Sequence, residues 1–374
     1  MPPPSALGYV IAGAKVPTET GFKVPLSKLG DPVFQDPIVN VTFEVFILAD
    51  HLLRVKLYDA SESRFEVPIV LNLPSSSASS PLYELKLTSE VPGDVFDTSL
   101  GGLILEDQFL SVTTLLPSKN VYGMGENTHP SFRTQMDGTV WSLFARDQWP
   151  EVDISPTDYQ FLDYPSLTYR TIGGILDFFF VLGPEPETVT SQYTALIGRP
   201  VMPPYWALGF QLSRLYFMYG YEDLQHMKDA MNRTLQLDIP IDVQYADIDH
   251  MDRQKDFTLD EEKFGGLGAY AEELHASGHR FIIILDPAIN LSESEYPTHA
   301  RALAADAYIK WPEGTDQATL DYNNGGGSSM MLAYVWPENR TAFPNWHKQA
   351  TQEWWTKEIR LFHQKIPFDG LWIV

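Results

Sequence analysis

The stretches IDVQYADIDHMD at residues 241–252 and FIIIL at residues 281–285 decide the fold of this chain. Both contain a run of strand length, and 281–285 is apolar throughout, as in a strand covered on both faces. Between them, a stripe at helical spacing ends at Gly278 and consists of Leu267, Tyr270, Ala271 and Leu274. A strand, a helix and a strand in series predict parallel β-α units.

The same alternation continues on both sides of these stretches. Residues 206–210 and 371–373 are apolar enough to predict two more strands. Two further helical stripes lie beside them, formed by Leu224, Met227, Met231 and Leu235 and by Trp355, Ile359, Phe362 and Ile366. Thr351 is the expected N-cap of the last helix. About four β-α units predict a parallel sheet, which is either doubly wound or part of a (β/α)8 barrel.

The first 200 or so residues have a different pattern. Apolar and polar residues alternate at 41–45, 54–58 and 82–87, and a Pro- and Ser-rich turn lies at 73–81. Short alternating strands separated by turns predict an antiparallel β-sandwich. The pattern changes near Gly198-Arg199-Pro200, which predicts one domain at residues 1–199 and a second at 200–374.

Composition restricts the partners. The net charge of −23 disfavours nucleic acid and anionic membranes but not neutral sugars. The absence of cysteine excludes disulfides and thiolate chemistry. We expect no membrane segment and no signal peptide, since no run reaches about 20 apolar residues and the first residues lack the required pattern. Asn-x-Ser/Thr sequons, which are candidate N-glycosylation sites, occur at Asn40, Asn232, Asn290 and Asn339.

Carboxylates follow or open the predicted strands. Asp247, Asp249 and Asp252 follow one strand, Asp286 follows the next, and Asp369 opens the last. Such groups can bind metal, perform acid-base chemistry or hold sugar hydroxyls, and the alternative is loop capping and solvated charge. His250 is expected to be structural, because no second histidine stands at metal-ligand spacing nearby.

These motifs, with others in the same order along nearly the whole chain, resemble glycoside hydrolase family 31, and in particular its maltase-glucoamylase and sucrase-isomaltase group. The matching stretches are 120–126, 169–177, 198–210, 242–258, 283–289, 335–337, 353–355 and 368–373. The resemblance implies an N-terminal β-sandwich of the galactose-mutarotase type, followed by the first half of a TIM barrel.

The resemblance also implies an activity. Such a protein is a retaining, exo-acting α-glucosidase that uses two carboxylates about 5 Å apart on α-glucosides such as maltose. It needs no metal or organic cofactor, and by family it is secreted or lumenal. Carried over by position, the substrate-binding residues are Asp247, Ile248, Ile284, Trp336, Trp372, Asp147 and Tyr219.

The sequence departs from the family at two places. The nucleophile is an aspartate directly after Trp372-Ile373, where this sequence has Val374, and the region of the general acid is not matched. An internal deletion is expected near 150–166. We therefore expect the 374-residue chain to be a front part of the enzyme without activity alone. The alternatives are a non-catalytic carbohydrate-binding or interaction protein on the same fold, and an unrelated doubly wound α/β protein.

Overall fold

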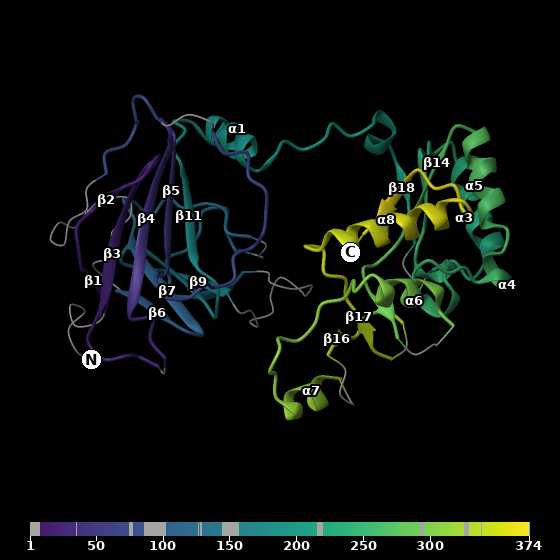
Figure 1. Ribbon diagram of the computed structural model, residues 1–374. Coiled ribbons are helices and arrows are strands. Elements are labelled where there is room, and N and C mark those ends of the chain that lie inside the picture. The colour runs from purple at the N-terminus through teal and green to yellow at the C-terminus, as the bar shows by residue number, and fades with distance from the viewer. Residues whose placement is uncertain are drawn as a thin grey trace. The chain divides into compact units, whose positions relative to one another are not determined.

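The structure is a computed structural model that describes residues 8–34, 36–74, 78–85, 102–125, 127, 129–143, 157–214, 220–291, 295–324, 329–337 and 339–373. The chain divides into two compact units, residues 1–200 and 201–374 (Figure 1). The described part of the first unit is mostly β-structure, whereas the second alternates strands with helices.

The first unit contains two antiparallel sheets and the helix α1 (Pro186–Ile197). One sheet has the order β1-β3-β4-β5-β11 with β2 beside β3, and its strands are β1 (Gly8–Ile11), β2 (Val16–Pro17), β3 (Gly21–Leu29), β4 (Asn40–Ala49), β5 (Leu52–Asp59) and β11 (Leu176–Val181). The other has the order β6-β7-β10-β9-β8, and its strands are β6 (Leu103–Glu106), β7 (Phe109–Leu115), β8 (Val140–Ser142), β9 (Thr157–Leu162) and β10 (Ser166–Thr171).

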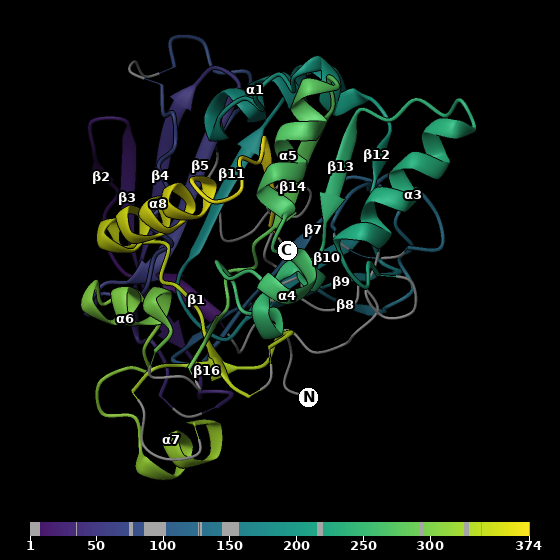
Figure 2. The same ribbon diagram turned by 90° about the vertical axis from the view of Figure 1, so that its right-hand side faces the viewer.

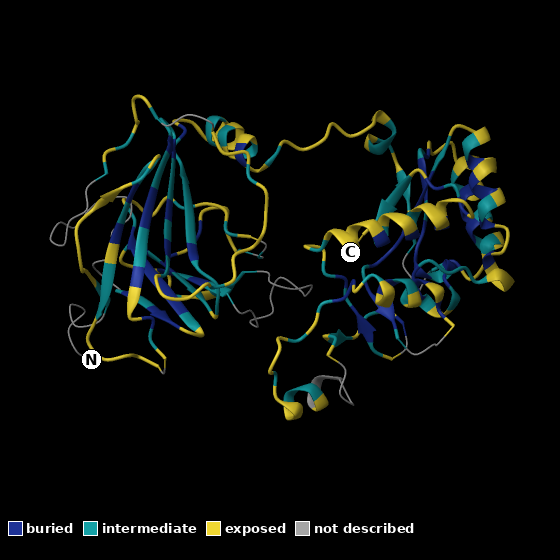
Figure 3. Cartoon of the chain, viewed as in Figure 1, coloured by how far each residue is buried: buried dark blue, intermediate teal, exposed yellow. Residues whose placement is uncertain are grey.

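Both sheets of the first unit contribute to one apolar core. Phe22, Val45 and Val55 of the first sheet are buried together with Leu105 and Val112 of the second. Figure 3 shows this buried layer in dark blue along the inner strands. The predicted antiparallel sandwich is therefore present, with alternate residues of each strand turned inward.

Two of the three predicted strands of this unit are confirmed, since residues 41–45 lie in β4 and 54–58 lie in β5. The prediction for 82–87 is wrong at residues 82–85, and 86–87 lie outside the described residues. The Tyr83 hydroxyl lies 3.2 Å from the carbonyl oxygen of Ala49 and 3.3 Å from that of Leu52. The side chain of Tyr83 therefore contacts the ends of β4 and β5. The alternating pattern of residues 82–87 indicated a strand instead.

The second unit is built on a parallel sheet with the order β12-β13-β14-β18. Its strands are β12 (Gln211–Leu212), β13 (Val243–Ala246), β14 (Arg280–Ile284) and β18 (Gly370–Trp372). Figure 2 shows β12, β13 and β14 with the helices α3 and α5 beside them. About four parallel strands connected through helices agree with the predicted portion of a TIM barrel.

Helices lie beside the sheet and supply about half of the buried residues of the second core. The α-helices are α3 (Leu224–Gln236), α4 (Glu261–Phe264), α5 (Leu267–Ala276), α6 (Pro297–Ala304), α7 (Gln317–Asn324) and α8 (Gln349–His363). Short 3-10 helices are η2 (Tyr205–Leu208), η3 (Ile248–His250) and η4 (Asp252–Gln254). The core joins Met227 of α3, Leu267 of α5, Phe281 of β14 and Phe362 of α8. None of the helices within the described residues is long and apolar enough to cross a membrane.

The second unit also contains a separate, small antiparallel sheet. It has the order β15-β17-β16, and its strands are β15 (Ile289–Asn290), β16 (Leu332–Ala333) and β17 (Thr341–Ala342). Together with α6 and α7 it forms a long excursion between β14 and α8.

The strand predicted at 206–210 is wrong. Residues 205–208 form η2, and the parallel strand begins only at Gln211. Pro204 precedes this helix and Gly209 ends it, where an added Cβ would lie 1.9 Å from Oδ2 of Asp242. The apolar pattern therefore did not distinguish this short helix from a strand.

The N-cap prediction for α8 is also wrong. Lys348 occupies that position, and Thr351 is buried inside the first turn, where its hydroxyl donates to the carbonyl oxygen of Ala307 at 3.1 Å. The buried residues of this helix are Thr351, Trp354, Glu358 and Phe362. The apolar stripe predicted from Trp355 and Ile359 is thus rotated, because the polar pair of Thr351 and Glu358 lies on the covered face.

Candidate functional site

Strand register brings three of the predicted site residues to one edge of the parallel sheet. Ala246 pairs with Ile283 across β13 and β14, and Ile284 pairs with Trp372 across β14 and β18. Asp247 directly follows Ala246, so Asp247, Ile284 and Trp372 form a row at the carboxyl ends of three neighbouring strands. Ligands of parallel β/α domains bind at this edge.

The carboxyl group of Asp247 is buried and half satisfied. The side chain is 3% exposed, and its Oδ1 accepts the backbone N–H of Ile248 at 2.8 Å. Oδ2 has no hydrogen-bond partner among the described residues. Burial raises the pKa of Asp247 above its ordinary value. A buried carboxylate with one vacant oxygen is suited to accept a hydrogen bond from a ligand hydroxyl.

Asp249 forms a second carboxyl group on the same turn. Burial raises the pKa of Asp249 to about 6, the Asp247 carboxylate contributes further, and the backbone N–H of Tyr221 opposes the change. Its Oδ2 is buried without a hydrogen-bond partner among the described residues. Two neighbouring carboxyl groups with raised pKa values are typical of functional sites, although structural networks also produce them.

His250 supports this turn from inside the core. The residue is fully buried, and its Nδ1 lies 2.7 Å from the carbonyl oxygen of Asp247. Its ring packs at 6.2 Å from Phe362 of α8. Burial lowers the pKa of His250 to about 4, so the ring is neutral and donates from Nδ1. This agrees with the structural role expected for His250.

Aromatic side chains surround the same edge. The rings of Trp372 and Tyr245 meet edge to face at 5.9 Å. A cavity of about 430 Å³ lies at the exits of β14 and β18, lined by Pro287, Trp346, Trp355 and Ile373. Aromatic faces of this kind are suited to stacking against sugar rings or other apolar groups.

The remaining predicted residues are not all part of this row. Ile248 is buried in η3, directly after Asp247. Trp336 lies between β16 and β17 and is 37% exposed, so strand register does not place it beside Asp247. Asp147, Tyr219 and Val374 lie outside the described residues.

The other two predicted strand-end carboxylates lie at opposite ends of the sheet, Asp286 after β14 at the same edge as Asp247 and Asp369 before β18. Asp369 lies at the opposite, amino-terminal end of β18, where its Oδ2 lies 2.7 Å from Nε2 of His275 and accepts the N–H of Phe281 at 2.8 Å. Asp286 follows β14 and is 5% exposed. Within the described ranges, no three His, Asp or Glu side chains converge as metal ligands.

Asp256 is a buried residue of this region that sequence reasoning passed over. It is 2% exposed, and its Oδ1 accepts the backbone N–H of Asp286 at 3.2 Å. It stands between polar Lys255 and apolar Phe257, with polar Thr258 next, so the local pattern does not distinguish a buried position from a solvated one. The one available signal was its place inside the matching stretch 242–258.

These features define a parallel β/α domain whose carboxyl edge carries a buried carboxylate beside aromatic side chains, the arrangement of an enzyme barrel. A sequence model of the glycosyl hydrolases family 31 TIM-barrel domain matches residues 200–373. The chain belongs to glycoside hydrolase family 31.

Known proteins resemble the chain beyond this domain. Intestinal sucrase-isomaltase of Oryctolagus cuniculus is 34% identical, over 96% of this chain and 21% of that protein. Lysosomal alpha-glucosidase of Mus musculus is 31% identical, over 99% of this chain and 41% of that protein. The chain therefore spans about a fifth to two fifths of these relatives. The glucosidase II alpha subunit shares the fold, with a TM-score of 0.68 at 15% identity over 100% of this chain and 52% of that one.

Proposed function

We propose that the chain is the front part of a retaining, exo-acting α-glucosidase that binds the terminal glucose of α-glucosides such as maltose. The observation that carries the proposal is the row of Asp247, Ile284 and Trp372 at the carboxyl edge of a family 31 barrel segment. In it, Asp247 accepts glucose hydroxyls and the apolar side chains form the wall of the pocket. Ile248, Trp336, Asp147 and Tyr219 complete the proposed substrate-binding set.

The proposed architecture follows the same family. Residues 1–199 are a galactose-mutarotase-like sandwich with an internal deletion near 150–166, and residues 200–374 are the first part of the barrel. A secreted or lumenal location is supported by relatives whose names are intestinal and lysosomal.

Sugar binding tests the pocket directly. We expect saturation-transfer NMR to detect maltose on the 374-residue chain, and Asp247→Ala to abolish the signal because it removes the buried acceptor. Asp252→Ala is the matched control, since Asp252 lies on the same segment with a side chain 43% exposed. Equal signals from wild type and Asp247→Ala would overturn the pocket assignment.

Catalysis is tested separately. We propose that the 374-residue polypeptide does not turn over a chromogenic α-glucoside, because the position expected for the nucleophile carries Val374. A longer protein with aspartate after Ile373, the sandwich gap filled and the missing barrel strands should release the α-anomer first, as proton NMR detects. Release of the β-anomer would contradict retention. Sugar binding without turnover in every longer form would favour the non-catalytic carbohydrate-binding alternative.

A further inference from the structure

The loop that follows Asp247 and Ile248 is held by the buried carboxyl group of Asp256. Asp256 is 2% exposed and accepts the backbone N–H of Asp286 at Oδ1, at 3.2 Å. The backbone N–H of Ala288 donates to the same carboxyl group. Its Oδ2 has no hydrogen-bond partner among the described residues. One side chain thus connects the loop after β13 with the loop after β14.

The loop from Met251 to Thr258, called the Asp256 loop below, has an unfavourable backbone. Arg253, Gln254 and Phe257 have φ values of 50°, 58° and 60°. For residues with a Cβ this left-handed region costs of order 1–3 kcal/mol each, and it persists only where the surroundings enforce it. The Asp256 loop therefore needs strong external contacts to keep its shape.

Other contacts share this task, and the ring of Phe257 packs against Trp355 of α8 at 4.9 Å. The Thr258 hydroxyl accepts the N–H of Asp252 at 3.0 Å, and the hydroxyl of Tyr296 donates to the carbonyl oxygen of Asp256 at 2.5 Å. At the other end, the N–H of Met251 donates to the carbonyl oxygen of Ile248 at 3.1 Å, in the turn that begins at Asp247. The backbone between Asp256 and Asp247 is thus short and internally hydrogen-bonded.

We propose that Asp256 is a positioning residue: its buried carboxyl group clamps the Asp256 loop to the loop after β14, and so fixes the backbone that presents Asp247. The role of Asp247 in sugar binding rests on the proposed function. The clamp itself rests only on the contacts of Asp256.

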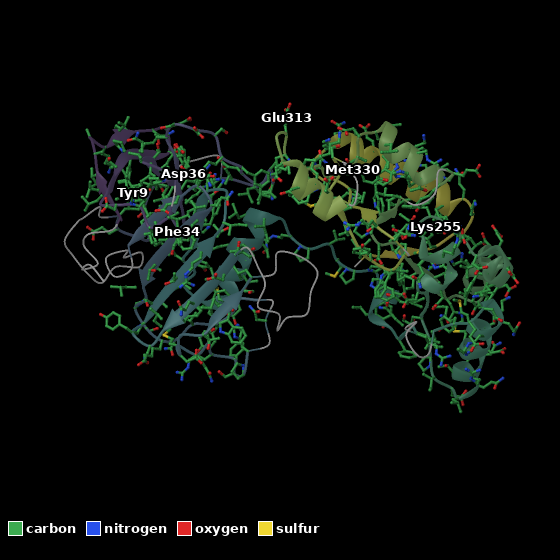
Figure 4. The ribbon with its side chains drawn as sticks, turned by 90° about the horizontal axis from the view of Figure 1, so that it is seen from below. Tyr9, Phe34, Asp36, Lys255, Glu313 and Met330 are labelled. Atoms are coloured by element: carbon green, nitrogen blue, oxygen red, sulfur yellow. The ribbon has the colours of Figure 1, made fainter. Side chains whose placement is uncertain are left out.

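Several ionisable groups face Asp256. They are Asp286 from the loop after β14, Tyr296 before α6, and Lys255 on its own loop, whose Nζ lies 2.9 Å from Oδ2 of Asp252 (Lys255 is labelled in Figure 4). Beyond Tyr296, Glu358 of α8 is paired with Arg301. Lys255 is thus engaged with another carboxylate, and Asp286 adds charge of the same sign.

Burial, and then the Asp286 carboxylate, raise the pKa of Asp256 well above its ordinary value. An acid whose pKa is raised in the folded state contributes stability in acid, and this stability is lost as the pH rises through the raised value. The folded state is therefore favoured when Asp256 carries a proton, because the two backbone N–H bonds only partly offset the cost of burying its charge. In Asp256→Asn, the side-chain amide keeps an oxygen that accepts hydrogen bonds but cannot ionise at any pH.

Hydrogen exchange on the full 374-residue chain tests the clamp without any sugar. Asp256→Ala removes the acceptor, so amides of 247–258 and 286–291 should exchange about tenfold faster or more. In wild type, exchange corrected for the chemical rate should accelerate as the pH rises through the raised pKa of Asp256, because the ionised carboxylate is costly to keep buried. Asp256→Asn should remain protected and show no such acceleration.

Asp223→Ala is the matched control, because Asp223 caps α3 by accepting the N–H of His226 and lies outside the Asp256 loop. It should leave the exchange of 247–258 unchanged. If Asp256→Ala fails to fold, the pH profile of Asp256→Asn decides the matter. A profile equal to that of wild type, or unchanged exchange in Asp256→Ala, would overturn the clamp. Loss of maltose binding with an intact clamp would instead count against the proposed function.

Discussion

The Nδ1 atom of His250 lies 2.7 Å from the backbone carbonyl oxygen of Asp247, three residues earlier, and the imidazole ring is fully buried. The ring therefore holds the backbone of Asp247 by a hydrogen bond from the core side. A protonated ring could also donate this hydrogen bond, but burial disfavours its charge, so acid destabilises the folded state.

We expect His250 to make the second unit sensitive to acid. A base whose pKa is lowered to about 4 from 6.5 in the folded state contributes stability above 6.5, and this is lost as the pH falls toward 4. This pKa difference corresponds to about 3 kcal/mol of unfolding free energy. Chemical denaturation of His250→Gln should show a smaller loss of unfolding free energy over this range than wild type. Parallel curves for the two proteins would contradict the assignment.

Asp249 should titrate differently when its neighbour is neutral. Its pKa is raised to about 6 by burial first and by the Asp247 carboxylate second. Asp247→Asn removes the second cause, so the pKa of Asp249 should fall but stay above its ordinary value. Carbon-13 NMR of the side-chain carboxyl group measures this. Asp252→Asn is the control and should leave the pKa of Asp249 unchanged. An unchanged pKa of Asp249 in Asp247→Asn as well would show that Asp247 and Asp249 are not coupled.

The buried pair of Arg301 and Glu358 should stabilise the packing of α6 on α8. Nε of Arg301 lies 2.5 Å from Oε1 of Glu358, and Glu358 is 1% exposed. The Arg301 side chain is 35% exposed and Thr298 also donates to Glu358, so Arg301→Met should cost about 1.5–3 kcal/mol, as for a lost hydrogen bond to a charged group. Urea denaturation should report this loss, and Arg301→Met with Glu358→Met should recover much of it.

An exposed pair provides the comparison. Lys310 contacts Asp306 with side chains 46% and 57% exposed. Lys310→Met should change the unfolding free energy by about 0.5 kcal/mol or less, because solvent screens such pairs. A loss for Arg301→Met no larger than this would show that the buried pair contributes little.

The four sequons differ in accessibility, so their glycosylation should differ. Asn290 is 2% exposed in β15, whereas Asn40, Asn232 and Asn339 are exposed. A bulky glycan cannot occupy a buried position in the folded chain. When the protein is made in a secretory host, mass spectrometry of the folded fraction should find glycan on Asn339 and none on Asn290. Asn339→Gln should remove one glycan mass, and a glycan on Asn290 in folded material would contradict the burial.

Local patterns in the sequence were sufficient for most elements. The strands at 41–45, 54–58 and 281–285 and the helices from Leu224 and Leu267 follow from periodicity, which depends on residues next to one another. The common edge of Asp247, Ile284 and Trp372 also followed, because carboxyl ends of parallel strands meet on one side of the sheet.

Long-range contacts decided the rest. From the sequence, Glu358 would be expected on the solvated face of its helix. In the structure it lies on the buried face of α8, paired with Arg301, which is 57 positions earlier in the sequence. From the sequence, nothing distinguishes Asp256 from other loop residues. In the structure the backbone N–H groups of Asp286 and Ala288 donate to its carboxyl group. Burying a charged group is costly unless partners compensate, and those partners come from other elements. The sequence alone therefore determined which strands and helices form and which strand ends carry carboxylates, while only the tertiary structure decided which of these polar groups are enclosed.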